Sequence, residues 1–122
     1  MINVICDTSF LIHLATKRIK NLDNLVVEIG SINFLVPEVV KYELEKLINN
    51  SEKKSKISMT IDYIQKFETI PITGKFADEE LFNYATTHSI VLATLDKELK
   101  KKIRKLGKSI MTIHNDKILF EN

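Results

Sequence analysis

Residues 90–111 read IVLATLDKELKKKIRKLGKSIM, and this stretch contains two short strands with a helix between them. Residues 90–93 are apolar and suit a buried strand, and residues 110–113, Ile-Met-Thr-Ile, suit a second one. Between them, Asp96 can cap a helix whose apolar residues recur every three or four positions, and Gly107 stands where a helix ends. The stretch therefore predicts a strand, a helix and a further strand in close succession.

The same alternation extends over the rest of the chain. Further strands are expected at residues 2–6 and 34–36, with weaker candidates at 68–71 and 117–120. The expected helices follow residues 7–9, cover residues 21–29 and 54–67, begin at Pro37, and open at Thr73-Gly74. Alternating strands and helices predict an α/β fold, a three-layer α/β/α sandwich with a mostly parallel central sheet.

Length and composition restrict the classes of protein that fit. A chain of 122 residues has room for one domain, expected to span residues 1–122, with one hydrophobic core. No apolar run approaches the roughly 20 residues of a membrane helix, and the N-terminus has no signal-peptide pattern, so we expect a cytoplasmic protein. The single cysteine, Cys6, lies in an apolar run and is expected to be a small buried residue.

The charge distribution is uneven. Residues 97–108, KELKKKIRKLGK, contain seven of the 18 basic residues and one of the 16 acidic residues. The rest of the chain carries 11 basic and 15 acidic residues, so a basic segment stands on a mildly acidic body. Such a segment indicates an edge that faces a polyanion, although a solvated helix face is the simpler alternative.

Four acidic residues follow strands or stand early in helices. Asp7 and Asp96 come just after expected strands, Glu43 lies in the helix after the second strand, and Asp78 lies in the first turn of a later helix. In an open α/β sheet the functional crevice lies beyond the carboxyl ends of the strands. We therefore expect these four side chains at the same end of the sheet.

Each acid also has a structural explanation. Asp7 and Asp96 can be helix N-caps, Asp78 can complement a helix dipole, and Glu43 can be a solvent-facing residue near Lys46. Four converging carboxylates would repel one another and need a cation, and oxygen ligands favour Mg²⁺ or Mn²⁺. The histidines are scattered in the sequence and suggest no zinc site.

An acidic cluster with Mg²⁺ or Mn²⁺ is suited to phosphodiester hydrolysis. The basic helix that begins at Asp96 would then hold phosphates beside the metal. The candidate contacts to the nucleic-acid backbone are Lys100, Lys101, Arg104 and Lys108.

Four blocks of the sequence resemble PIN domains. They are VICDTSFLI (residues 4–12), VPEVVKYELEKL (36–47), FADEELFNYA (76–85) and the stretch quoted first (90–111). Their order and spacing agree with that family over residues 2–120. The resemblance implies a PIN-type sandwich and metal-dependent endonucleolytic cleavage of RNA.

The resemblance also implies roles for individual residues. Asp7, Glu43, Asp78 and Asp96 would be the catalytic, metal-binding acids. Ser9 and Thr94 would support them by hydrogen bonds, and Glu79 would add an outer contact to the site. Leu95 stands where the family often has Asn, which removes one polar contact and no metal ligand. Asp116, in His-Asn-Asp-Lys, is expected in a turn between two strands rather than at a metal.

Several alternatives stay open. The family includes compact archaeal and ribosomal-RNA-processing nucleases and VapC-type toxins, so the partners besides RNA are an antitoxin or a ribosome-assembly protein, and a homodimer is possible. No membrane partner is expected. The leading alternative function is an inactive PIN-fold module that binds RNA or a protein. A receiver domain lacks its acidic pair here, and Ser9 breaks the Asp-x-Asp of haloacid-dehalogenase-like phosphatases.

Overall fold

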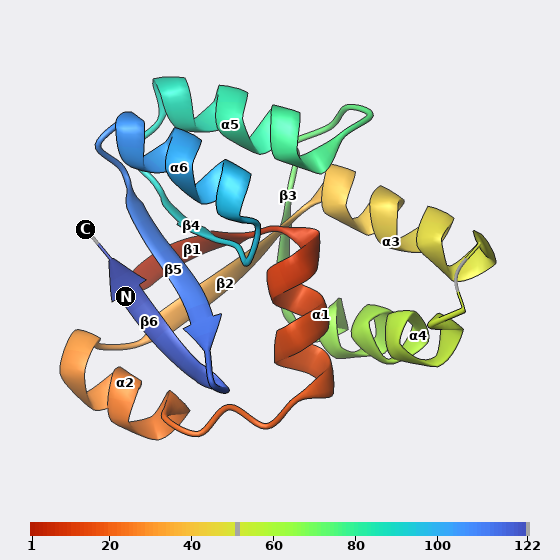
Figure 1. The fold of residues 1–122 in the computed structure, drawn as a ribbon, viewed down its shortest axis with the longest axis horizontal. Coiled ribbons are helices and arrows are strands. Elements are labelled where there is room, and N and C mark those ends of the chain that lie inside the picture. The colour runs from red at the N-terminus through yellow and green to blue at the C-terminus, as the bar shows by residue number, and fades with distance from the viewer. Residues whose placement is uncertain (51, 122) are drawn as a thin grey trace.

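The computed structural model describes residues 1–50 and 52–121, and its elements follow the predicted alternation (Figure 1). In chain order they are β1 (Ile2–Cys6), α1 (Thr8–Thr16), α2 (Leu22–Ile29), β2 (Ile32–Pro37), α3 (Glu38–Asn50), α4 (Lys54–Tyr63), the 3-10 helix η1 (Ile64–Lys66), β3 (Glu68–Ile70), α5 (Ala77–Thr87), β4 (Val91–Ala93), α6 (Lys97–Lys105), β5 (Ser109–His114) and β6 (Lys117–Glu121).

In the described part of the chain, six strands form one sheet in the order β3-β2-β1-β4-β5-β6. The first five strands are parallel, and β6 pairs antiparallel with β5. From β1, the strands β2 and β3 are added toward one edge of the sheet. The chain then crosses back, and β4 and β5 are added on the other side of β1. Right-handed crossovers therefore place α5 and α6 on the face opposite to the earlier helices. This arrangement confirms the predicted α/β sandwich with a mostly parallel sheet.

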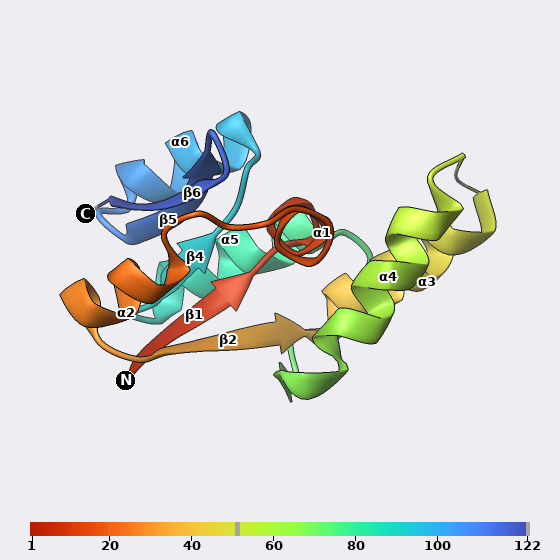
Figure 2. The same cartoon turned by 90° about the horizontal axis from the view of Figure 1, so that it is seen from below.

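α5 packs beside α6 and also contacts α3, and α4 packs against α1 and α3. Figures 1 and 2 both place α1 between the α3–α4 pair and the β5–β6 hairpin. No helix in the described ranges combines the length and apolar character that crossing a membrane requires.

The carboxyl ends of β1 and β4 meet at the point where the topology reverses. The chain leaves β1 toward β2 and leaves β4 toward β5, on opposite sides of this pair. The two strands are parallel neighbours, and Cys6 lies beside Ala93 in the register. In doubly wound sheets such a switch point opens the crevice that binds ligands.

Burial on both faces of the sheet explains its apolar strands. Val4 and Cys6 of β1 and Leu92 of β4 are fully buried, which confirms that Cys6 is a buried residue. Phe10 of α1 and Ile103 of α6 are also fully buried. Each such side chain contributes about 1.5–3 kcal/mol through removal of apolar surface from water.

α3 begins at Glu38 rather than at Pro37, which ends β2, and two other helices differ from the prediction by three or more residues at one end. α5 begins at Ala77 rather than at Thr73-Gly74, because Gly74 has a φ of +141° and Phe76 is extended at φ −124° and ψ 121°. The helix expected over 54–67 ends at Tyr63 and tightens into η1 before β3.

The C-terminal hairpin agrees with the prediction. Asn115 and Asp116 turn the chain between β5 and β6 with φ values of 51° and 60°. Asn and Asp tolerate this left-handed backbone and are typical of tight hairpin turns. Asp116 Oδ1 also lies 3.0 Å from His13 Nε2, which ties the turn to α1.

Candidate active site

Asp7 lies directly after β1, at the switch point, and is held on both carboxylate oxygens. Its amide donates to the Ala93 carbonyl at 2.9 Å, which continues the β1–β4 pairing. Oδ1 accepts hydrogen bonds from Ser9 Oγ at 2.8 Å and from the Phe10 amide at 2.9 Å. Oδ2 accepts one from Thr94 Oγ1. Asp7 is thus the N-cap of α1, and it is also fixed against the loop after β4.

Ser9 and Thr94 link Asp7 to that loop. Thr94 Oγ1 accepts a hydrogen bond from the Asp96 amide at 3.0 Å, and Ser9 Oγ accepts one from the Leu95 amide at 3.1 Å. Leu95 therefore takes part through its main chain, so the absence of Asn at this position leaves the link intact. The loop after β4 cannot move without disturbing the hydroxyls that hold Asp7.

Asp96 is the N-cap of α6 and is exposed. Its Oδ1 accepts hydrogen bonds from the Glu98 amide at 2.9 Å and from the Leu99 amide at 3.2 Å. Both amides bind the same oxygen, so Oδ2 takes no part in the cap. Capping and ligand binding are therefore compatible roles for this residue.

Glu43 and Asp78 come from two further helices. Glu43, on α3, accepts a hydrogen bond through Oε2 from the Ala77 amide at 3.3 Å, which joins α3 to the beginning of α5. Asp78 stands in the first turn of α5 and is exposed. The contact with Ala77 brings Glu43 next to Asp78 in space, although 34 residues separate Glu43 from Ala77.

All four predicted acids line one cavity of about 150 Å³, together with Thr8, Ser9 and Ala77. Thr8 is 7% exposed, and among the described residues its Oγ1 has no hydrogen-bond partner. Buried polar atoms without a partner are uncommon in folded proteins. Within residues 1–50 and 52–121, no three Asp, Glu, His or Cys side chains are arranged closely enough to hold a metal ion as they stand.

Burial raises the pKa of Asp7 from 3.8 to about 6, against the lowering effect of the hydrogen bonds from Thr94, Phe10 and Ser9, and with a further increase from the charge of Asp96. The folded chain thus holds a poorly solvated carboxylate beside other acids, which a cation would stabilise.

The donors in the cavity fit a hydrated Mg²⁺ or Mn²⁺ ion. They are carboxylate oxygens of Asp7, Glu43, Asp78 and Asp96. Mg²⁺ usually keeps several waters and takes one or two carboxylates directly, so acids that share a cavity without direct contact suit it.

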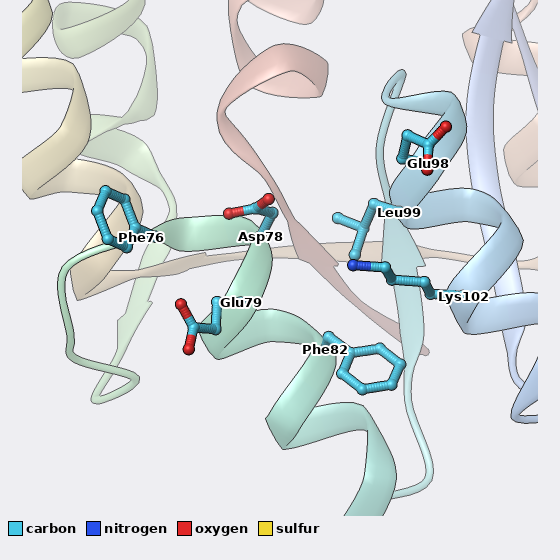
Figure 3. A pocket seen from close by; sticks show the side chains of 7 residues that line it. All are labelled: Phe76, Asp78, Glu79, Phe82, Glu98, Leu99 and Lys102. Carbon is cyan, nitrogen blue, oxygen red and sulfur yellow. The ribbon is translucent and has the colours of Figure 1, made fainter.

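Glu79 does not line this cavity. It lines a neighbouring cavity of about 430 Å³, which also touches Phe76, Phe82 and Lys102 and shares Asp78 with the acid cavity (Figure 3). Its outer contact to the acids stays a prediction.

The basic segment lies on α6 and just beyond it. Lys101 is exposed and Lys100 half-buried, Arg104 binds Glu121 on β6, and Lys108 follows the end of the helix. Their contact with RNA remains a prediction. Lys102, which the sequence analysis did not single out, lines the 430 Å³ cavity.

The sequence analysis also missed Thr8 and Phe76 as residues of this region. Thr8 follows Asp7 directly, and that adjacency was the available signal. Lys102 stands three residues after the buried Leu99, so helical spacing places it on the flank of the buried stripe. The position of Phe76 depends on the turn at Gly74, where the glycine was the available signal but was assigned to the helix start.

Comparisons with known proteins identify the family. A family model described as a PIN-like domain matches residues 4–115. The chain therefore belongs to the PIN-domain family.

Similar proteins include Ribonuclease VapC4 of Methanocaldococcus jannaschii, 28% identical over 96% of this chain and 94% of the relative. Ribonuclease VapC9 of Archaeoglobus fulgidus is 30% identical over 95% of this chain and 86% of the relative. The human rRNA-processing protein FCF1 homolog is 34% identical over 70% of this chain but only 43% of the relative. The structure of the PIN domain endonuclease Utp24 superposes with a TM-score of 0.77 at 30% identity, covering 98% of this chain and 90% of that one.

Proposed function

We propose that the chain is a metal-dependent endoribonuclease in which Asp7, Glu43, Asp78 and Asp96 bind Mg²⁺ or Mn²⁺. The observation that carries this proposal is that acids from four separate elements line one cavity at the switch point of the sheet. The relatives named ribonucleases and the endonuclease Utp24 support cleavage of RNA as the reaction.

The residues of the chain have distinct tasks in this proposal. When bound, the ion supplies electrophilic activation for hydrolysis of the phosphodiester bond. Ser9 and Thr94 orient Asp7, and the Ala77 amide orients Glu43. The resemblance to the family implies products with 5′-phosphate and 3′-hydroxyl ends.

Cleavage of a labelled single-stranded RNA in Mn²⁺, Mg²⁺ or EDTA tests the proposal. Asp7→Asn and Asp96→Asn remove charge with little change in shape, and Asp62→Asn, at an exposed position on α4, is the matched control. We expect metal-dependent cleavage by the wild type and the control, and loss of at least 100-fold in the two site variants, on the scale of removing one electrostatic contact to the transition state. Equal cleavage by folded Asp7→Asn would contradict the assigned site.

A PIN-fold module that binds without cleaving is the second candidate. It is favoured by one observation, that no three of the acids within the described ranges already form a closed set of ligands. An active site should gain thermal stability with Mn²⁺, because a ligand that binds the folded state stabilises it. RNA binding without metal-induced stabilisation and without cleavage would favour the binding module.

The biological role divides into two proposals. The archaeal VapC relatives match over nearly their whole length, whereas the match to FCF1 covers less than half of that protein. We therefore favour a VapC-type toxin with an antitoxin partner over an rRNA-processing nuclease with a ribosome-assembly partner, in the cytoplasm in either case. Growth arrest on expression of wild type, absent with Asp7→Asn, would support the toxin, and accumulation of precursor rRNA on its loss would support processing.

A further inference from the structure

A second basic surface lies away from α6, where the loop after α1 passes the tip of the β5–β6 hairpin (Figure 1). This surface contains a cavity of about 560 Å³, called the hairpin site below. Its lining residues come from the loop and from the hairpin, and they are Lys20, His114, Asn115, Asp116, Lys117 and Leu119. Both lysines are exposed, and within residues 1–50 and 52–121 neither forms an ion pair.

Positive charge dominates the hairpin site. Asp116 is the one acidic residue among those that line it, and its carboxylate lies 3.0 Å from His13 Nε2. Lys17 and Arg18, on the same loop, are exposed and add to the charge. The next acid along the chain is Asp23, which stands in the first turn of α2 and complements that helix dipole. The hairpin site therefore suits an anionic ligand.

Hydrogen bonds hold the loop against the hairpin. The Lys20 amide donates to the Asp116 carbonyl at 2.8 Å. The Asn21 side-chain amide donates to the Ile118 carbonyl at 2.9 Å, and the Asn21 side-chain oxygen accepts from the Ile118 amide at 2.8 Å. Asn21 thus takes the place of a neighbouring strand at this point of the sheet edge. Lys20 and Lys117 are presented from an ordered surface, which lowers the entropic cost of binding to it.

The hairpin site lies at the same end of the sheet as the acid cavity. Met111 lies beside Ala93, the last residue of β4, and β5 continues in parallel to His114, which is roughly 10 Å farther. His13, through which α1 meets the hairpin, stands six residues after Asp7, or about 9 Å along the helix. α1 contains no acidic residue. A strand bound at the acids can therefore reach the hairpin site along α1 without meeting a like charge on this helix.

We propose that the hairpin site is a second binding site for the RNA backbone, at which Lys20 and Lys117 hold phosphates of the strand that is cut at the acids. The inference rests on the proposed nuclease function and adds that the substrate extends from the cleavage site past α1 to the hairpin. Contacts to phosphates carry no sequence information, so the hairpin site contributes affinity and register rather than choice of base.

The test removes charge from the protein and from the RNA in turn. In the Asp7→Asn background, which keeps the strand intact, binding of an RNA of about 16 nucleotides is measured by fluorescence anisotropy over a range of salt concentrations. The glutamine pair is Lys20→Gln with Lys117→Gln, and the arginine pair, Lys20→Arg with Lys117→Arg, keeps the charge. Lys54→Gln with Lys56→Gln, at exposed positions on α4, removes the same charge elsewhere.

The glutamine pair should lower the slope of log affinity against log salt by about 1.4, because each phosphate contact on a single strand contributes about 0.7. At about 0.1 M salt this change corresponds to roughly 25-fold weaker binding. The arginine pair should match the parent, which shows that loss of charge and not a disturbed hairpin is responsible. The α4 pair should stay within about twofold of the parent, because distant charges are screened.

An uncharged methylphosphonate linkage, moved along the RNA, locates the contact. The parent should lose affinity when this linkage stands at a position remote from the cleavage site mapped with the wild-type protein. The glutamine pair should lose nothing further at that position. Equal losses in the glutamine pair and the α4 pair would overturn the proposal, since net charge would then govern binding. Unchanged affinity of the glutamine pair would also overturn it, and this result is expected if the hairpin site binds an acidic protein instead.

The hairpin site and the nuclease fail separately. Metal-dependent cleavage by the wild-type protein, together with unchanged RNA affinity of the glutamine pair, overturns the hairpin site and leaves the nuclease standing. RNA binding that depends on Lys20 and Lys117, in a protein that does not cleave, supports the hairpin site and overturns the nuclease. A wild-type protein that neither binds nor cleaves RNA overturns both.

Discussion

Asp7 is a single residue whose burial in the proposed site lowers the stability of the folded, metal-free chain at neutral pH. The residue caps α1, and three hydrogen bonds hold it, yet burial raises the pKa of its carboxyl to about 6. A capping aspartate on the surface would have no such shift. The sequence supported the cap and, through the family resemblance, the site, but burial of Asp7 depends on how α1 and the loop after β4 pack, which no local pattern encodes.

Replacing Asp7 with Asn is expected to stabilise the metal-free protein at neutral pH. Because the folded-state pKa is raised from 3.8 to about 6, the folded chain binds the proton more tightly than the unfolded chain. The contribution of Asp7 therefore becomes less favourable as pH rises from about 4 to 6, by at most roughly 3 kcal/mol. The destabilisation by the buried carboxylate is fully present above about pH 6 and absent below about pH 4.

Urea unfolding in EDTA across pH 4–7.5 measures this effect. The unfolding free energy of Asp7→Asn minus that of the wild type should grow as pH rises from about 4 to 6. Weaker hydrogen bonding between the introduced amide and Thr94 reduces this difference. Asp62→Asn, at an exposed position on α4, is the control for loss of one carboxylate, and the pH dependence assigned to Asp7 is the excess over this control. A flat difference for Asp7→Asn would mean that the carboxylate is well solvated in the folded chain.

At the scale of the element, hydrophobic spacing predicted most strands and helices and failed where a turn decided the boundary. The stretch 90–111 was predicted closely, because Asp96 caps α6 and Gly107 follows its end with a φ of 75°. The start of α5 was predicted too early, because Gly74 was assigned to the helix start although glycine disfavours helix and here has a φ of +141°. Hydrophobic spacing alone does not show that Phe76 is extended.

Gly74→Ala tests the importance of that turn. Its φ of +141° suits glycine, and an added Cβ would lie 2.5 Å from the Glu80 side chain. We expect a loss of about 1–3 kcal/mol in unfolding free energy and a displaced Phe76. Gly30→Ala is the matched control, because Gly30 also has a positive φ, +87°, but has nothing within 4 Å of the new Cβ. If both variants lose the same stability, the close approach to Glu80 contributes nothing.

The basic helix gives a second prediction at this scale. Lys102 lines the cavity beside the acids, whereas Lys105 is an exposed residue at the end of α6. Lys102→Ala should weaken RNA binding across all sequences and reduce the slope of log affinity against log salt by about one. Lys105→Ala should do less, although it removes the same charge. Equal effects in a salt titration would show that net charge, not position, governs binding.

At the scale of the whole molecule, the site depends on strand order. The sequence alone predicted that Asp7 and Asp96 follow strands, but it did not show that β1 and β4 are neighbours or that α3 meets α5. Those contacts bring residues 7, 43, 78 and 96 into one cavity. The positions of the acids relative to the expected strands and helices singled them out, the family resemblance implied their roles, and the fold gives a physical reason why these positions come together. The surrounding cavities and Phe76 became visible in the folded chain.

The central claim is that this cavity is a divalent-metal site. The most direct measurement is an anomalous difference map from crystals of the wild-type protein soaked in Mn²⁺. The account predicts a peak in the cavity between Asp7 and Asp96, absent from Asp7→Asn crystals soaked in the same way. A map without a peak among the four carboxylates, at a Mn²⁺ concentration that supports RNA cleavage, would contradict it.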